Sequence, residues 1–314
     1  MRNSALDDRL AVFTGVPSSR SRRLGTGLRI AQAALGVFHA DVGSLLARFV
    51  TSESPPRRLA KVVNVERADC HGMTVWTLRS NAVTPPSGMR VVCLHGGGYI
   101  HQPTTTHWRD YVALARESGA AVMVPMYPVI PHGTASTVVP LVADLISDLV
   151  NAHGADTVSV YGDSAGGGLA LAATQELVRR ETPTHGRMVL LSPWLDVTLS
   201  DPDTDDIDDP ALNLGILRGS GRQWAGQLDP ADPLVSPLFG PLTGLPPTTV
   251  YSGSRDMLCL DAINLRDRAI AEGIDIDFVL RAGLIHDWAM SGMPEATEVR
   301  PDILRRLLGG ERAP

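Results

Sequence analysis

The feature that most constrains the fold is an alternation of short apolar segments with longer amphipathic ones from residue 89 onward. Runs rich in Val, Ile and Leu have the length of buried strands and cover residues 89–94, 120–125, 157–161, 187–191, 248–251 and 276–280. Helical candidates lie between them, at 108–117, 137–151, 168–180 and 260–272. Two further strands are expected before this region, at 61–65 and 73–78, around a turn at 70–72. This alternation predicts the α/β class, with a mostly parallel sheet covered by helices on both faces.

Two segments do not follow the alternation and are expected to form a helical cap. Apolar residues recur every three or four positions over 28–50, the period of an amphipathic helix. The other segment is an insertion that contains six aspartates within 201–209. Such a run is usually solvated surface, and a metal site there is a minor alternative. The predicted organisation is N-terminal cap helices at 1–60, a first core part at 61–195, a cap insertion at 196–238 and a second core part at 239–314.

Composition excludes several classes of protein. A chain of 314 residues with 44% hydrophobic residues can bury a sizeable core. Its net charge of -6 is the wrong sign for binding a phosphate backbone, so no nucleic-acid partner is expected. Three widely spaced cysteines predict neither a disulfide framework nor a zinc site. Polar residues interrupt the apolar stretch at 31–50, which predicts no leader and no stable membrane insertion, and hence a cytoplasmic protein.

The N-terminal segment is basic, in contrast to the acidic remainder of the chain. One interpretation is contact with an acidic membrane surface. The favoured one is a helical arm that lies on the acidic body of the protein.

A candidate nucleophile lies where a predicted strand meets a predicted helix. Residues 162–166 read Gly-Asp-Ser-Ala-Gly and match the pattern G-x-S-x-G. A nucleophile elbow strains the backbone of its serine, and small neighbours let strand and helix approach closely enough to expose the hydroxyl. Ser164 is therefore the predicted nucleophile. The alternative is a glycine-rich helix start that only caps the helix or binds a phosphate.

A serine hydroxyl needs a histidine base that is itself held by a carboxylate. The expected chain order is Ser, Asp or Glu, then His, and of the nine histidines only His185 and His286 follow Ser164. His185 precedes a strand and is expected on the far side of the sheet, so His286 is the predicted base. For the carboxylate, Asp256 lies one strand before His286. It is favoured over Asp196, which is expected to cap a turn.

The run His95-Gly-Gly-Gly98 follows the predicted strand at 89–94. Glycines leave the backbone accessible, so this run is expected to supply N–H donors for the oxyanion formed by attack on a carbonyl. A phosphate cradle is the rival interpretation. It would need G-x-x-x-x-G-K-[ST], or G-x-G-x-x-G followed by an acidic residue after the next strand, and neither occurs.

These motifs together resemble the hormone-sensitive-lipase-like family of α/β hydrolases, the bacterial carboxylesterases and acetyl-hydrolases, over roughly residues 60–310. The likeness rests on seven stretches in family order, His95-Gly-Gly-Gly98, Gly162-Asp-Ser-Ala-Gly-Gly167, Leu191-Ser-Pro-Trp194, Ser236-Pro-Leu238, Gly244-Leu-Pro-Pro247, Gly253-Ser-Arg-Asp256 and Gly283-Leu-Ile-His286. The resemblance implies an α/β-hydrolase fold, and a triad of Ser164, Asp256 and His286. It also implies an oxyanion hole built from the N–H groups of Gly97, Gly98 and Ala165.

The chain departs from the family pattern at two places. Where relatives commonly carry Tyr-Arg-Leu-Ala-Pro-Glu, this chain has Tyr127-Pro-Val-Ile-Pro-His132. After the predicted base it has Asp287-Trp288 in place of the usual Gly-Phe. These differences bear on the shape of the substrate, since no triad or oxyanion position changes.

The predicted function is hydrolysis of short-chain carboxylic esters through an acyl-enzyme, with a small-molecule ester as partner and with no metal or organic cofactor. Short acyl chains are expected because Trp194, Trp224 and Trp288 would crowd a longer one. The alternatives are a lipase or amidase of the same fold, or a non-catalytic small-ligand receptor, against which His286 argues. A homodimer is left open.

Overall fold

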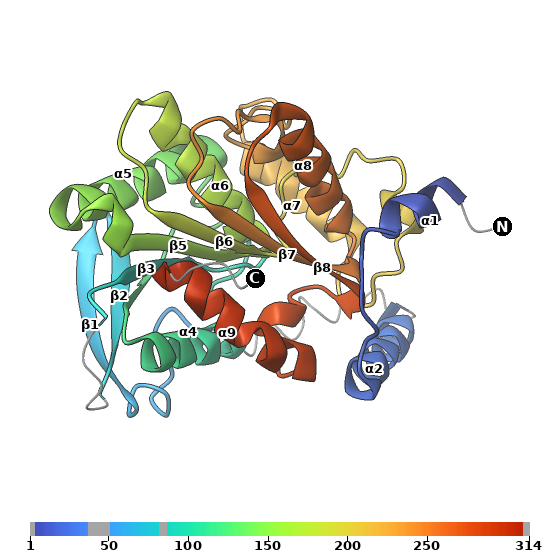
Figure 1. Cartoon of the computed structure of the whole chain (residues 1–314), viewed down its shortest axis with the longest axis horizontal. Coiled ribbons are helices and arrows are strands. Elements are labelled where there is room, and N and C mark those ends of the chain that lie inside the picture. Colours follow the sequence, from blue (N-terminus) through green and yellow to red (C-terminus); the bar gives the residue numbers. More distant parts are fainter. Residues whose placement is uncertain (1–3, 37–50, 82–86, 310–314) are drawn as a thin grey trace.

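The computed structural model describes residues 4–36, 51–81 and 87–309. At its centre is an eight-stranded sheet with the order β1-β2-β4-β3-β5-β6-β7-β8 (Figure 1). The strands are β1 (Val63–Cys70), β2 (Met73–Ser80), β3 (Arg90–Leu94), β4 (Ala121–Pro125), β5 (Val158–Asp163), β6 (Arg187–Leu191), β7 (Thr248–Arg255) and β8 (Ile276–Ile285). β2 runs antiparallel to β1 and β4, and all the other neighbours are parallel. The predicted α/β class with a mostly parallel sheet is confirmed.

Helices cover both faces of the sheet, as Figure 1 shows. One face carries α5 (Ala135–His153), α6 (Ser164–Arg179) and α8 (Cys259–Glu272), and the other carries α4 (Thr105–Ser118) and α9 (Pro294–Leu308). Side chains of β3 alternate between the two apolar cores that result, because Val92 packs with the first set of helices and Val91 with the second. Buried on both faces, the central strands are almost continuously apolar.

Helix α5 is, among the helices in the described part of the chain, the only one long and apolar enough to cross a membrane by length and composition. Its Val138, Val142 and Ile146 are fully buried in the core between α5 and the sheet. The apolar composition of α5 is thus accounted for by packing on the sheet.

The N-terminal helices differ from the prediction. The structure has α1 (Ser4–Leu10) and α2 (Ser19–Gly36), so α2 begins well before the predicted helix at 28–50, and residues 37–50 of that prediction lie outside the described residues. The buried positions early in α2 are Ser21 and Gly25, whereas Leu24 and Ile30 are exposed. No apolar period therefore marks the start of this helix.

The insertion contains a 3-10 turn (Thr204–Asp206) and helix α7 (Leu214–Ala225). The sequence predicts that its aspartates are solvated surface residues, but several of them bind other parts of the protein. Arg9 of α1 donates to Asp201 at 2.7 and 2.9 Å and to Asp203 at 2.7 Å. Asp209 accepts from the backbone N–H of Met257 at 2.9 Å and from two N–H groups of its own loop. The aspartate run thus joins the insertion both to the N-terminal arm and to the loop after β7.

Replacing Arg9 by methionine is expected to lower the free energy of unfolding by about 1 to 3 kcal/mol, because it removes the guanidinium that donates to two partly buried carboxylates. Urea unfolding followed by circular dichroism measures this. Arg67→Met is the matched control, since Arg67 and Asp69 form an exposed pair on β1 that is worth about 0 to 1 kcal/mol. Equal losses in the two variants would contradict the stabilising role of Arg9.

Candidate active site

Ser164 lies at the turn between β5 and α6, with a φ of 50° that is unusual for a residue other than glycine. Close packing enforces this turn. A Cβ on Gly162 would lie 2.5 Å from the carbonyl oxygen of Gly166, and one on Gly166 would overlap the carbonyl oxygen of Leu94. The strand and helix approach as closely as a nucleophile elbow requires. Ser164 lines a cavity, although only 4% of it is exposed.

His286 and Asp256 meet at the same edge of the sheet. Asp256 directly follows β7 and His286 directly follows β8, and these strands are parallel neighbours. His286 Nδ1 lies 2.9 Å from Asp256 Oδ2, and Asp256 is fully buried. The structure thus brings two of the predicted residues into contact, and His286 lines the same cavity as Ser164.

The rejected candidates lie elsewhere and have other partners. Both carboxylate oxygens of Asp196 accept hydrogen bonds from Thr198 and Ser200, at 2.6 to 3.0 Å, so Asp196 caps a turn at the start of the insertion. His185 is buried against Thr174 of α6, 2.9 Å from its hydroxyl. Burial lowers the pKa of His185 to about 4.

The glycine run after β3 forms one wall of the cavity. Gly97 and Gly98 line the cavity and have φ values of 116° and 61°, which favour glycine. Ala165 is the second residue of α6, and an N–H group in the first turn of a helix has no intrahelical acceptor. His95, which precedes the three glycines, is fully buried and stacks on Tyr127 with ring centroids 4.2 Å apart. Burial lowers the pKa of His95 to about 3 and keeps this ring neutral.

Asp163 joins the elbow to the glycine run, a role that the sequence did not reveal. Its Oδ2 accepts from the backbone N–H of Gly96 and from Nε2 of His107, each at 2.9 Å. The Thr104 backbone N–H donates to His107 Nδ1 at 2.9 Å, so the ring proton of His107 is on Nε2. The spacing of Thr104 and His107, a capping box at the start of α4, is a sequence signal that could have indicated this histidine.

The other ring nitrogen of His286 faces Asp287. Nε2 of His286 lies 3.2 Å from Oδ2 of Asp287, which also lines the cavity. Burial alone would lower the pKa of His286, but Asp256 and then Asp287 outweigh it and raise this pKa to about 10. Burial raises the pKa of Asp287 to about 8. The replacement of the usual Gly-Phe by Asp287-Trp288 was the only sign of this contact in the sequence.

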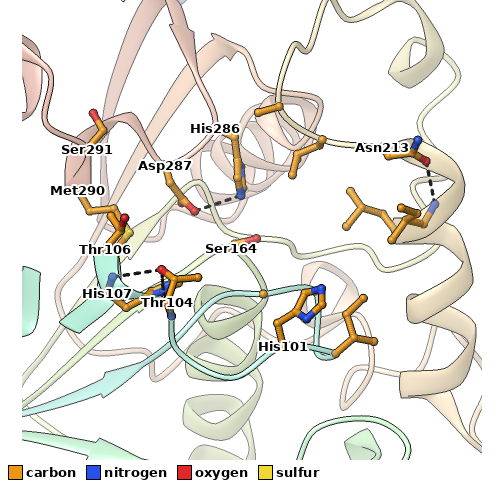
Figure 2. Close-up of a pocket in the computed structure, with 17 residues that line it drawn as sticks. His101, Thr104, Thr106, His107, Ser164, Asn213, His286, Asp287, Met290 and Ser291 are labelled. Carbon is orange, nitrogen blue, oxygen red and sulfur yellow. Dashed lines mark hydrogen bonds and ion pairs between the residues drawn. The ribbon is translucent and has the colours of Figure 1, made fainter. Parts of the chain in front are cut away.

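The cavity has a volume of about 390 Å³, and Figure 2 shows Ser164, His286 and Asp287 facing into it. Both apolar and polar side chains line it. The apolar residues are Ile100, Ala211, Leu212, Ile216, Leu217 and Met290, and polar ones include Thr104, Thr106, His107 and Ser291. In Figure 2 these four polar residues and Met290 lie on the side of Asp287. Asn213 caps α7 by accepting from the N–H of Ile216 at 3.1 Å, which fixes the helix that carries Ile216 and Leu217.

The tryptophans do not crowd this cavity, contrary to the prediction. Trp194, Trp224 and Trp288 are at most 1% exposed, and none is among the described residues that line the cavity. Trp224 stacks on Tyr99 with ring centroids 3.9 Å apart, inside the core. Aliphatic side chains, mainly of α7 and the loop before it, limit the cavity instead.

Comparison with known proteins identifies the family. Residues 91–290 match the α/β hydrolase fold family. The chain is 45% identical to a triacylglycerol lipase of Mycobacterium tuberculosis over 76% of this chain, and it spans half the length of that protein. It is 33% identical to an acetyl-hydrolase of Streptomyces hygroscopicus, over 71% of this chain and 77% of the relative.

A solved structure, a hormone-sensitive lipase from a metagenome library, superposes with a TM-score of 0.79 at 24% identity, over 94% of this chain and 99% of that one. This likeness shows a shared fold. The predicted resemblance to α/β hydrolases is confirmed by the family match and by the relatives named lipase and acetyl-hydrolase. The chain belongs to the α/β hydrolase fold family.

Proposed function

We propose that this protein is a serine hydrolase that cleaves carboxylic esters, with Ser164 as nucleophile, His286 as base and Asp256 as the carboxylate that orients the base. The observation that carries the proposal is the 2.9 Å contact between Asp256 and His286 beside a serine at a strained strand-to-helix turn. The names of the relatives, which include esterase, acetyl-hydrolase and lipase, support the same reaction.

The proposed reaction proceeds through an acyl-enzyme. Ser164 Oγ attacks the ester carbonyl and gives its proton to Nε2 of His286, while Asp256 stabilises the imidazolium. The tetrahedral intermediate collapses, and the leaving alcohol takes the proton from Nε2. Water then attacks the acyl-serine, Nε2 accepts a proton from the water, and the carboxylic acid is released as Ser164 regains its proton. These groups supply nucleophile, base and acid, so the proposed reaction uses no metal or organic cofactor.

The proposed oxyanion hole consists of the N–H groups of Gly97, Gly98 and Ala165. Rigid donors stabilise a developing oxyanion best when they need no rearrangement during the reaction. The hydrogen bond from Gly96 to Asp163, the residue before Ser164, supports this assignment because it holds the glycine run beside the elbow.

The proposed cap consists of residues 1–60 and 196–238, with the core at 61–195 and 239–314. Two observations support this division. Residues 211–213, 216 and 217 of the insertion line the cavity, and Arg9 ties the N-terminal arm to Asp201 and Asp203. The cap would therefore set the size of the ester that is accepted.

Short acyl chains are the proposed substrates, because about 390 Å³ lies near the lower end of the 300 to 1,000 Å³ that small-molecule pockets typically span. We expect kcat/KM for p-nitrophenyl esters to be highest between acetyl and hexanoyl and to fall at least about tenfold by dodecanoyl. Leu217→Ala, which enlarges the apolar wall, should move the maximum to longer chains. A maximum at dodecanoyl in the wild type would instead indicate a lipase.

The reaction itself is tested with p-nitrophenyl butyrate beside the matching anilide, together with labelling by a fluorophosphonate probe. Turnover of the ester and a single label on Ser164, located by peptide mass spectrometry, are expected. Faster turnover of the anilide would indicate an amidase. No turnover of either substrate, with Ser164 unlabelled, would favour a small-ligand receptor.

We further propose a cytoplasmic protein that binds a small-molecule ester and has no nucleic-acid partner and no stable membrane insertion. The net charge of -6 and the burial of the apolar side chains of α5 in the core support this proposal. A homodimer remains compatible with it, and sedimentation equilibrium measures that state directly.

A further inference from the structure

Asp287 is a charged residue on the cavity wall that the proposed reaction does not use. Its Oδ2 lies 3.2 Å from Nε2 of His286, the atom that must accept the proton of Ser164. Its Oδ1 is buried without a hydrogen-bond partner among the described residues. Figure 2 shows the carboxylate pointing at the imidazole above Ser164.

This contact favours a proton on Nε2, and a protonated Nε2 has no free lone pair. The ring already holds its Nδ1 proton against Asp256, 2.9 Å away. A carboxylate 3.2 Å from Nε2 stabilises the protonated, positively charged form of the ring. A protonated Nε2 is unable to accept a hydrogen bond from Ser164 until that proton leaves or the contact opens.

The surrounding charges favour retention of this proton. Asp256 acts on the ring from the loop after β7, and Asp209 acts on it from the insertion. Asp163 at the end of β5 acts on Asp287, where His286 and His107 of α4 oppose it. The raised pKa values of His286, about 10, and Asp287, about 8, follow from this excess of carboxylates in a buried site.

We propose that Asp287 is a positioning residue that occupies the Nε2 side of His286 in the free enzyme, so that His286 accepts the proton of Ser164 only after this contact has lost its proton or has opened around a substrate. The proposal rests on the proposed function, because it assigns Asp287 a role through His286. If Asp287 acts in this way, the enzyme is weakly active in mild acid and becomes progressively more active as the pH rises.

The backbone allows a clean test. Asp287 has a φ of 54°, a conformation that glycine adopts without strain, and its N–H donates to Ser192 Oγ at 3.1 Å. Asp287→Gly removes the carboxylate without backbone strain. Asp287→Asn keeps the size of the side chain and removes only its charge. The two variants therefore separate the effect of charge from the effect of volume.

The experiment measures kcat/KM for p-nitrophenyl butyrate, and the rate of fluorophosphonate labelling, from pH 5 to 10 in the wild type and both variants. Losing a carboxylate within 4 Å of the imidazole should move the acid limb of both profiles down by about 1 to 3 pH units. Around pH 6 the variants should then exceed the wild type by about tenfold or more, and this ratio should fall toward one as the pH rises to 10. Asp148→Asn removes an exposed carboxylate of α5 outside the cavity and should leave the profile unchanged.

Three results separate the possible failures. Acid limbs that coincide with the wild type within about 0.3 unit in both variants would overturn the role of Asp287. Rates lowered by the same factor at every pH would also overturn it, because they indicate a purely structural role. Ester turnover retained by Ser164→Ala would instead overturn the proposed function on which this inference rests.

Discussion

Replacing Ser164 by alanine is expected to lower kcat/KM for p-nitrophenyl butyrate by about 10⁴ to 10⁶-fold, the range seen when a serine hydrolase loses its nucleophile. The substitution removes one oxygen from a residue held in place by its neighbours, so the fold should remain. His286→Ala should cause a loss of similar size. The double variant should lose little more than either single one, because nucleophile and base act as a unit.

Stability must be measured alongside activity. Unfolding midpoints within a few degrees of the wild type would attribute the losses to chemistry. Undiminished turnover in either single variant would refute the assignment of that residue. A fluorophosphonate label that persists in Ser164→Ala would place the nucleophile elsewhere.

The second large effect distinguishes the two candidate carboxylates. Asp256→Asn should lower kcat by about 10⁴-fold, because an asparagine facing Nδ1 favours the wrong tautomer of His286 and no longer stabilises its charged form. Asp196→Asn should keep activity within a few-fold. Asp196 caps a turn through Thr198 and Ser200 and is bonded to neither His286 nor Ser164 among the contacts of the described residues.

The same kinetic assay, run at several pH values, checks this pair of variants. The control is direct, since both substitutions are isosteric and both remove one buried carboxylate. An Asp196→Asn variant as inactive as Asp256→Asn would contradict the choice of Asp256. So would an Asp256→Asn variant that retains wild-type kcat.

The central strands could be predicted from sequence because their surroundings are uniform. β3, β5 and β6 are buried on both faces, so each is a short apolar run with little ambiguity. β1 is different. It is mostly exposed, and pairing with β2 as far as Cys70 extends it beyond the predicted 61–65. Helix α9 was not among the predicted helices, since Pro301 and few apolar residues weaken its pattern.

The candidate site could be predicted as far as its residues follow strand ends in a fixed order. Ser164, Asp256 and His286 each follow a strand of the parallel region. Chain order left only His185 beside His286, and the position of His185 before a strand removed it. The contacts of Asp163 with His107, and of His286 with Asp287, depend on how separate loops converge. Only the folded chain determines such convergence. The prediction that the three tryptophans crowd the cavity was wrong for a similar reason. The sequence places a bulky residue near a motif but does not show whether its side chain points into the cavity or into the core.

The bridge made by Asp163 limits how such an enzyme can diversify. Asp163 directly precedes Ser164, and its carboxylate accepts from the N–H of Gly96. The position of the Ser164 nucleophile is therefore coupled to the position of the glycine run after β3. Mutations that admit bulkier esters by displacing that loop would misalign the nucleophile. Adaptation to new substrates is therefore confined to the insertion, where Ile216 and Leu217 can change without displacing Ser164 or the glycine run.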